Sequence, residues 1–157
     1  MKLELLSIGK QHDKNLKDAI EDFTNRIDKY FSVDWKLIAT PKNTASLSEN
    51  ELKKAEAELI FQQIKADDYV VLLDEKGKII SSVDLANFIQ QRANSSCKKV
   101  IFLIGGAFGV DKNISKRANY ILSLSKLVFP HMLVRLILAE QVYRACSILK
   151  NEKYHHI

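Results

Sequence analysis

The sequence predicts an α/β fold with a mostly parallel sheet flanked by helices, and two observations carry this prediction. Residues 69–73 (YVVLL) and 100–104 (VIFLI) are short, unbroken apolar runs rich in β-branched side chains. Such runs are typical of strands that are buried on both faces, as in a parallel sheet covered by helices. Segments with helical spacing of apolar residues lie between the strands. Strands and helices therefore alternate along the chain.

The first half of the chain supplies two further strands and two helices. Residues 3–8 predict a strand, and apolar residues at spacings of three and four over about 15–31 predict an amphipathic helix. Residues 33–39 alternate with polar side chains, which is typical of a strand near a sheet edge. Ser48 and Glu51 form a capping box that predicts the start of a second helix, ending near position 65.

The second half continues the alternation. Polar residues and a glycine after the first buried strand predict a turn over 74–78. Ser81 and Asp84 predict a helix start. The remaining expected elements are a short basic helix within 111–119, a strand over 120–124 and a long helix over 130–150.

Three glycines follow the buried strand at 100–104. Gly105, Gly106 and Gly109 allow a sharp turn and a close approach to a ligand at the carboxyl end of that strand. A tight turn with no ligand is the competing interpretation. The spacing does not match GxGxxG, so a dinucleotide site is disfavoured. Two buried strands that deliver loops to one sheet edge would build a ligand crevice there.

Composition narrows the class of protein. The 157 residues, 46% of them hydrophobic, suit one domain, and 24 basic against 19 acidic residues favour a polyanionic partner such as nucleic acid. Cys97 and Cys146 lack metal-ligand spacing, so we expect reduced thiols and no metal site. The N-terminus does not read as a signal peptide, and no apolar stretch approaches the ~20 residues that span a bilayer.

The helix at 130–150 carries apolar residues well beyond a single stripe. A chain of this size has little room to bury both sides of such a helix, so the pattern predicts a homodimer with this helix at the interface. Glu140 and Arg144 are spaced to pair within the helix or across to the partner.

Several motifs occur together in a characteristic order. They are KLELLSIGK at 2–10, LIGGAFG at 103–109, LSLSKLVFPH at 122–131, VRLILAEQVYRA at 134–145 and YHH at 154–156. In this combination the whole chain resembles the ribosomal RNA large subunit methyltransferase H family of the SPOUT methyltransferases. The resemblance implies a cytoplasmic, homodimeric enzyme that transfers a methyl group from S-adenosylmethionine to N3 of a pseudouridine in 23S ribosomal RNA, on the assembled ribosome.

The resemblance also implies one SPOUT domain over 1–157 with a trefoil knot in about 100–157. Periodicity alone does not indicate a knot, because threaded chains are rare. The residues that this resemblance assigns to the cofactor are Leu73, Gly105, Gly106, Ser125, Lys126, Leu127, Val128, Phe129 and Pro130.

Removing the proton of the N3 imide needs a general base or an electrostatic stabiliser. His155 is the candidate base, and Tyr154 and Arg144 are the other candidate catalytic residues. Since SPOUT dimers build their sites from both chains, these residues are expected to reach the partner's cofactor. His131, beside the cofactor loop, is equally suited to a direct catalytic role and to stabilising the knot, and His12 is expected to be solvated.

Other basic residues are candidates for RNA contact. Arg135 suits a phosphate or carboxylate, because guanidinium stays protonated. Lys112, Lys116 and Arg117 are further candidates for RNA phosphate. His156 stands where a common version of the family motif has arginine, which weakens the expected RNA contact of the tail.

Two other functions remain possible on the sequence alone. A non-catalytic, ribosome-associated factor could retain the knotted fold, although intact Gly105, Gly106 and Pro130 argue against a degenerate pocket. A nucleotide-using α/β enzyme is disfavoured, since the chain has neither a P-loop nor GxGxxG.

Overall fold

Five strands form one parallel sheet with the order β2-β1-β4-β3-β5, as described for residues 1–156 by a computed structural model. The strands are β1 (Lys2–Ile8), β2 (Val33–Ile38), β3 (Tyr69–Ile79), β4 (Lys99–Ile104) and β5 (Tyr120–Ser123). The helices are α1 (Lys17–Ile27), α2 (Glu49–Phe61), α3 (Ser82–Asn94), α4 (Lys112–Arg117) and α5 (His131–Leu149), with a short 3₁₀ turn at Thr44–Ser46. The predicted parallel α/β architecture is confirmed.

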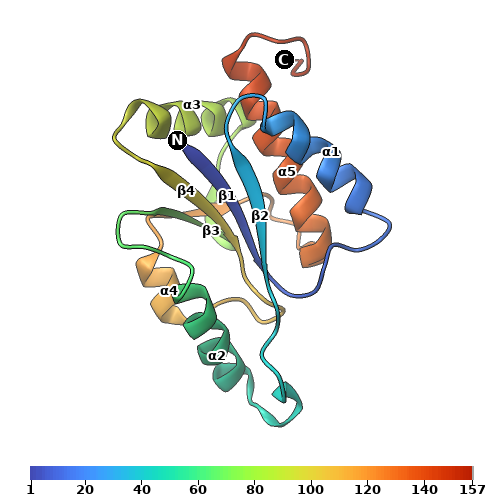
Figure 1. The fold of residues 1–157 in the computed structure, drawn as a ribbon, viewed down its shortest axis with the longest axis vertical. Helices are drawn as coiled ribbons and strands as arrows, with labels where there is room; N and C mark the ends of the chain where they lie inside the picture. Colours follow the sequence, from blue (N-terminus) through green and yellow to red (C-terminus); the bar gives the residue numbers. More distant parts are fainter. Residues whose placement is uncertain (157) are drawn as a thin grey trace.

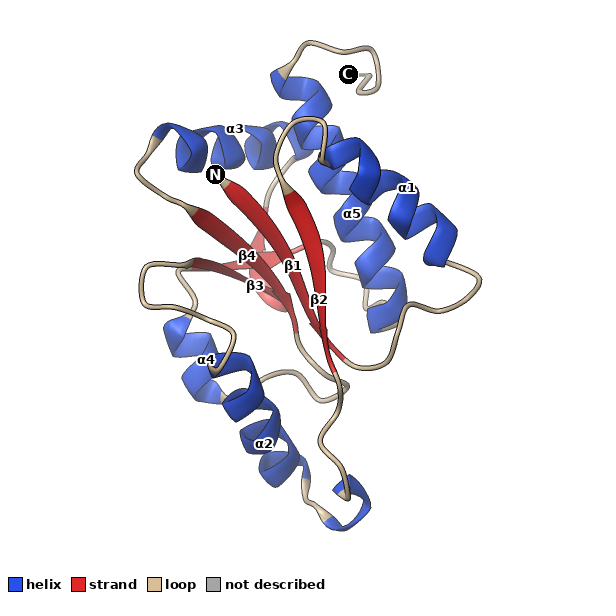
Figure 2. Ribbon diagram, viewed as in Figure 1, coloured by secondary structure: helices blue, strands red, loops and turns tan. Residues whose placement is uncertain are grey.

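Helices cover both faces of the sheet (Figures 1 and 2). Helices α1, α3 and α5 lie on one face, and α2 and α4 lie on the other. The buried strand β4 shows how the sequence divides between them. Val100, Phe102 and Ile104 pack into the core beneath α1, α3 and α5, while Ile101 and Leu103 pack against α2 and α4. This two-sided burial explains the unbroken apolar run.

The local signals in the sequence locate several elements correctly. Strand β2 lies at a sheet edge, as its alternating pattern predicts. Both predicted helix starts carry complete capping boxes, at Ser48 with Glu51 and at Ser81 with Asp84. Helices α1 and α2 are shorter than predicted, because their ends continue into turns that the apolar spacing does not distinguish from helix.

The turn predicted over 74–78 is wrong. Strand β3 continues to Ile79 and pairs with β5 on both sides of an irregularity between Leu73 and Lys78. Gly77 lies so close to β5 that a Cβ there would be 2.7 Å from the backbone oxygen of Ile121. The polar residues and the glycine thus mark a bulged strand pressed against an edge strand, rather than a chain reversal.

Helix α5 packs against α1 and α3 along its length (Figure 1). Leu138, Val142 and Cys146 are fully buried there, whereas Leu133 and Ile137 stay half-buried. Glu140 and Arg144 pair within the helix, with Arg144 Nε 3.0 Å from Glu140 Oε1. None of the helices described for residues 1–156 combines the length and apolar character needed to cross a bilayer.

Candidate functional site

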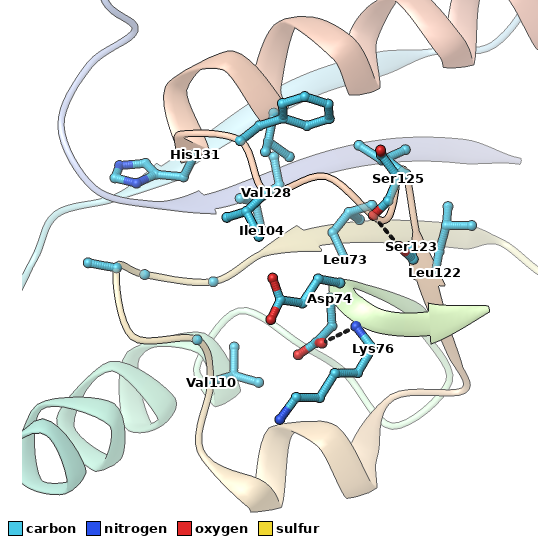
Figure 3. Close-up of a pocket in the computed structure, with 18 of the residues that line it drawn as sticks. Leu73, Asp74, Lys76, Ile104, Val110, Leu122, Ser123, Ser125, Val128 and His131 are labelled. Atoms are coloured by element: carbon cyan, nitrogen blue, oxygen red, sulfur yellow. Dashed lines mark hydrogen bonds between the residues drawn. The ribbon is translucent and has the colours of Figure 1, made fainter. Parts of the chain in front are cut away.

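A pocket of about 430 Å³ opens beside the bulge of β3 and the carboxyl ends of β4 and β5. It is lined by Leu73, which precedes the bulge of β3, and by Ile104 and Leu122 near the ends of β4 and β5 (Figure 3). The carboxyl ends of parallel strands meet at one sheet edge, which is where ligands bind in this class of fold. The crevice predicted at the ends of the two buried strands is therefore present.

The pocket brings most of the predicted cofactor residues together. Those that line it are Leu73, Gly105, Gly106, Ser125, Leu127, Val128 and Phe129. Lys126 belongs to the same loop but is exposed and does not line the pocket, and Pro130 is the residue that precedes α5. Segments far apart in sequence thus converge on one cavity.

The loop between β5 and α5 is held by its own serines. Ser123 Oγ donates to the carbonyl of Ser125 at 2.8 Å, and Ser125 Oγ accepts from the backbone N–H of Leu127 at 2.9 Å. These bonds present Leu127 and Val128 outward, with 71% and 76% of their surface exposed. Two neighbouring aliphatic side chains this exposed at a pocket mouth are available to a ligand or to another chain.

The glycine loop supplies a wall made of backbone. A Cβ at Gly105 would lie 2.6 Å from Val110 Cγ1, and one at Gly106 would lie 2.6 Å from Glu56 Oε2. Gly109 has φ +82° and donates its N–H to the carbonyl of Gly106 at 3.1 Å. A side chain at Gly105 would require Val110 or the loop to move, and one at Gly106 would require the Glu56 side chain or the loop to move, so both glycines have a packing reason.

Sequence reasoning did not assign the polar side of the pocket. Asp74, Glu75 and Lys76 line it from the bulge of β3, and His131 lines it from the start of α5 (Figure 3). Asp74 accepts the backbone N–H of Lys76 at 2.8 Å. The position of Asp74 directly after a buried strand was the available signal, because such positions face ligands in parallel sheets.

The three candidate catalytic residues lie together but away from this pocket. Tyr154 donates its hydroxyl to Glu140 at 3.0 Å, and Arg144 NH1 lies 3.3 Å from His155 Nδ1. None of Arg144, Tyr154 and His155 lines the pocket. Arg144 lies thirteen residues beyond His131 along α5. At about 1.5 Å per residue it is roughly 20 Å from the start of that helix.

Charge and burial shape this tail cluster. The Arg144 guanidinium lies 4.8 Å from the centre of the Tyr154 ring. Its hydrogen bond to Glu140 raises the pKa of Arg144, and burial followed by the hydrogen bond to Glu140 raises the pKa of Tyr154. The cluster therefore presents a permanent cation next to a neutral phenol, in a fixed geometry.

The predicted roles of Arg135 and His12 are wrong. Arg135 is fully buried, and its Nε donates to Ser7 Oγ at 3.0 Å and its NH1 to the carbonyl of Lys10 at 2.9 Å. It cannot reach RNA phosphate from there. His12 is half-buried rather than solvated, 3.3 Å from Arg135 NH1 and 4.9 Å from the Trp35 ring. The loop after β1 folds over the start of α5, and sequence spacing does not show this.

The three basic residues of helix α4 have different surroundings. Lys112 and Lys116 are exposed, as an RNA-contacting role requires. Arg117 instead donates to the backbone carbonyls of Lys65 at 2.8 Å and Asp68 at 2.9 Å. Its guanidinium thus ties α4 to the segment before β3.

Stability should depend on pH through His12 and His131. Burial first, and the charge of Arg135 second, lower the pKa of both imidazoles from the ordinary 6.5. The unfolded chain then binds more protons than the folded chain just below pH 6.5, so stability present above that pH is lost as the pH falls. Urea unfolding at about pH 7.5 and about pH 5.5 measures how much of the free energy of unfolding is lost between them. The double variant His12→Asn/His131→Gln should lose less than the wild type. An equal loss in both would contradict this assignment.

Comparisons with known proteins identify the family and agree with the fold. A family model described as "Predicted SPOUT methyltransferase" matches residues 1–155. A Cytophaga hutchinsonii protein named ribosomal RNA large subunit methyltransferase H is 46% identical over 156 residues, covering 99% of this chain and 100% of that protein. A Clostridium botulinum protein of the same name is 40% identical over 158 residues, covering 99% of each.

A solved structure supports the fold alone. It is described as a probable methylase family protein from Haemophilus influenzae, and it matches with a TM-score of 0.54 at 15% identity, over 99% of this chain and 70% of that one. The family match over almost the whole chain makes the protein a methyltransferase of the SPOUT class. Within that class, the chain belongs to the family of ribosomal RNA large subunit methyltransferase H.

Proposed function

We propose that this chain transfers the methyl group of S-adenosylmethionine to N3 of a pseudouridine in 23S ribosomal RNA, on the assembled ribosome. The observation that carries the proposal is the convergence of the glycine loop and the 123–129 loop on one pocket in a member of this family. The proposal includes a cytoplasmic location, because that is where a bacterial ribosome would be met.

The pocket fits the proposed cofactor in size and chemistry. Its volume of about 430 Å³ lies within the range of sites that bury a nucleoside-sized ligand. Leu127, Val128 and Phe129 offer an apolar slot for adenine, with main-chain groups at its edge. The backbone at Gly105 and Gly106 lets the ribose and methionine portions approach. When bound, the cofactor supplies an already activated methyl group, so the chain mainly has to align it with N3 and exclude water.

The distance between pocket and tail cluster supports a homodimeric enzyme. One chain alone leaves Arg144, Tyr154 and His155 far from the pocket. A second chain packed against the half-buried face of α5 and the exposed Leu127 and Val128 would bring its own tail to that pocket. We assign His155 the role of base or base-orienting group, and Arg144 and Tyr154 the orientation of the RNA.

The proposal extends to the fold of the chain. We take residues 1–157 as one SPOUT domain with the trefoil knot in about 100–157. What supports the knot is the family membership and the path of the chain, which leaves the sheet at the edge strand β5 and returns along α5 to pack on α1 and α3. Ile157 lies outside the described residues.

Mixing two inactive variants tests the two-chain site. Gly106→Val disables the pocket and His155→Ala disables the tail. If each site takes its pocket from one chain and its tail from the other, half of the randomly mixed dimers carry one intact site, so about a quarter of wild-type activity should return. No recovery after verified subunit exchange would contradict a shared site. Full activity of His155→Ala alone would contradict its role as base.

The modified base identifies the reaction. Nuclease digestion of the methylated RNA, followed by chromatography and mass spectrometry, should yield pseudouridine methylated at N3. A methyl group on ribose, or on any other base, would contradict the proposed substrate position while leaving methyl transfer itself intact.

A further inference from the structure

Glu56 is a buried carboxylate without a partner. It lies on α2 and is 4% exposed, whereas Glu49, Glu51 and Glu58 on the same helix are exposed. Within residues 1–156 its carboxylate makes no hydrogen bond or ion pair, although charged side chains that are buried to this extent are normally paired. Burial raises the pKa of this carboxyl from its ordinary 4.5, and a positive charge bound nearby would offset that cost of burial.

The carboxylate lies against the glycine loop of the pocket. A Cβ at Gly106 would be 2.6 Å and 2.8 Å from the two carboxylate oxygens of Glu56. Gly106 lines the pocket, so a single stretch of glycine backbone separates the charge from the cavity. Because Gly106 has no side chain, its backbone is in contact with the carboxylate on one side and lines the pocket on the other.

The acidic side chains that line the pocket add to the negative charge of Glu56. Asp74 and Glu75 line it from β3. Lys76 opposes them, but its side chain is exposed and extends toward α4 (Figure 3). His131 also lines the pocket, and burial lowers its pKa, so it adds little positive charge near neutral pH. The pocket thus favours a cationic ligand over a neutral one of the same shape.

We propose that Glu56 is a specificity-determining residue that makes the pocket prefer the sulfonium of S-adenosylmethionine to the neutral thioether of S-adenosylhomocysteine. The inference rests on the proposed cofactor. Methyl transfer forms the N3–CH₃ bond and breaks the S–CH₃ bond, whose electron pair stays on sulfur, while the proton of N3 passes to the general base. The positive charge disappears with that step. The attraction of Glu56 then ceases, which favours exchange of the product for a new cofactor.

Calorimetry on Glu56→Gln tests this directly. Glutamine keeps the shape and removes the charge. We expect the Kd for S-adenosylmethionine to rise by about 10-fold and the Kd for S-adenosylhomocysteine to change by less than about 2-fold, as expected when a nearby charge is lost inside a protein. Glu58→Gln, an exposed site on the same helix, should leave both constants unchanged.

Each other outcome overturns the inference in a distinct way. If Glu56→Gln bound both ligands more weakly by the same factor, Glu56 would be a purely structural support of the glycine loop. Unchanged affinities would show that its charge does not reach the pocket. If the wild type bound neither ligand, the proposed cofactor itself would be wrong and the inference would fall with it. In steady-state assays Glu56→Gln should raise the KM for S-adenosylmethionine more than it lowers kcat, because the sulfonium carries its full positive charge before methyl transfer.

Discussion

Replacing Arg135 with alanine is expected to lower the free energy of unfolding by about 3 kcal/mol, through a cavity and buried acceptors left without donors. Arg135 is fully buried and donates to Ser7 Oγ and to the backbone carbonyl of Lys10. Alanine removes these donors together with a large side-chain volume. Urea denaturation monitored by the fluorescence of Trp35, which packs against His12, measures the change.

An exposed arginine provides the control. Arg26 on α1 pairs with Asp22 at 3.0 Å, and its side chain is 44% exposed. Arg26→Ala should lower the free energy of unfolding far less than Arg135→Ala, because exposed ion pairs contribute little to stability. Equal losses for the two variants would show that Arg135 is not the link between the loop after β1 and the start of α5.

Replacing Gly106 with valine is expected to weaken binding of S-adenosylhomocysteine by about 100-fold, because moving a ligand-contacting loop by an ångström has effects of this size. The first added carbon would lie 2.6 Å from Glu56 Oε2, and the two methyl groups of valine need still more room, so either the Glu56 side chain or the loop must shift. Using the neutral product as ligand keeps this test separate from the charge of Glu56. Calorimetry gives the affinity.

A graded series makes the result specific. Gly106→Ala should weaken binding by about 10-fold, between wild type and valine, since it adds only one carbon. Thermal unfolding of both variants should stay close to the wild type, which shows that the loss is local. Normal affinity in Gly106→Val would mean that the ligand does not bind beside this loop.

Local sequence patterns predicted much of the fold. The unbroken runs in β3 and β4, the alternating β2 and the two capping boxes are properties of neighbouring residues, so their spacing reveals them. The bulge at Gly77 was missed because only its contact with the Ile121 backbone distinguishes it from a turn.

The candidate site was likewise predicted where local patterns mark it and missed where distant residues meet. Gly105, Gly106 and the loop containing Leu127 could be predicted from strand ends and from the resemblance. The contact of Glu56 with Gly106 joins residues that no local pattern relates. The hydrogen bonds between Arg135 and the loop after β1 do the same, which is why a buried structural arginine was mistaken for a phosphate ligand.

Transfer of radiolabelled methyl from S-adenosylmethionine tests the central claim most directly. Three substrates are compared: assembled ribosomes that lack the modification, isolated large subunits and naked ribosomal RNA. We expect label in the RNA of assembled ribosomes alone, with none for Gly106→Val, since the candidate RNA contacts Lys112 and Lys116 would bind phosphates, which carry no sequence information, and recognition would depend on the shape of the particle. Absence of label from all three, despite measurable cofactor binding, would contradict the proposed substrate.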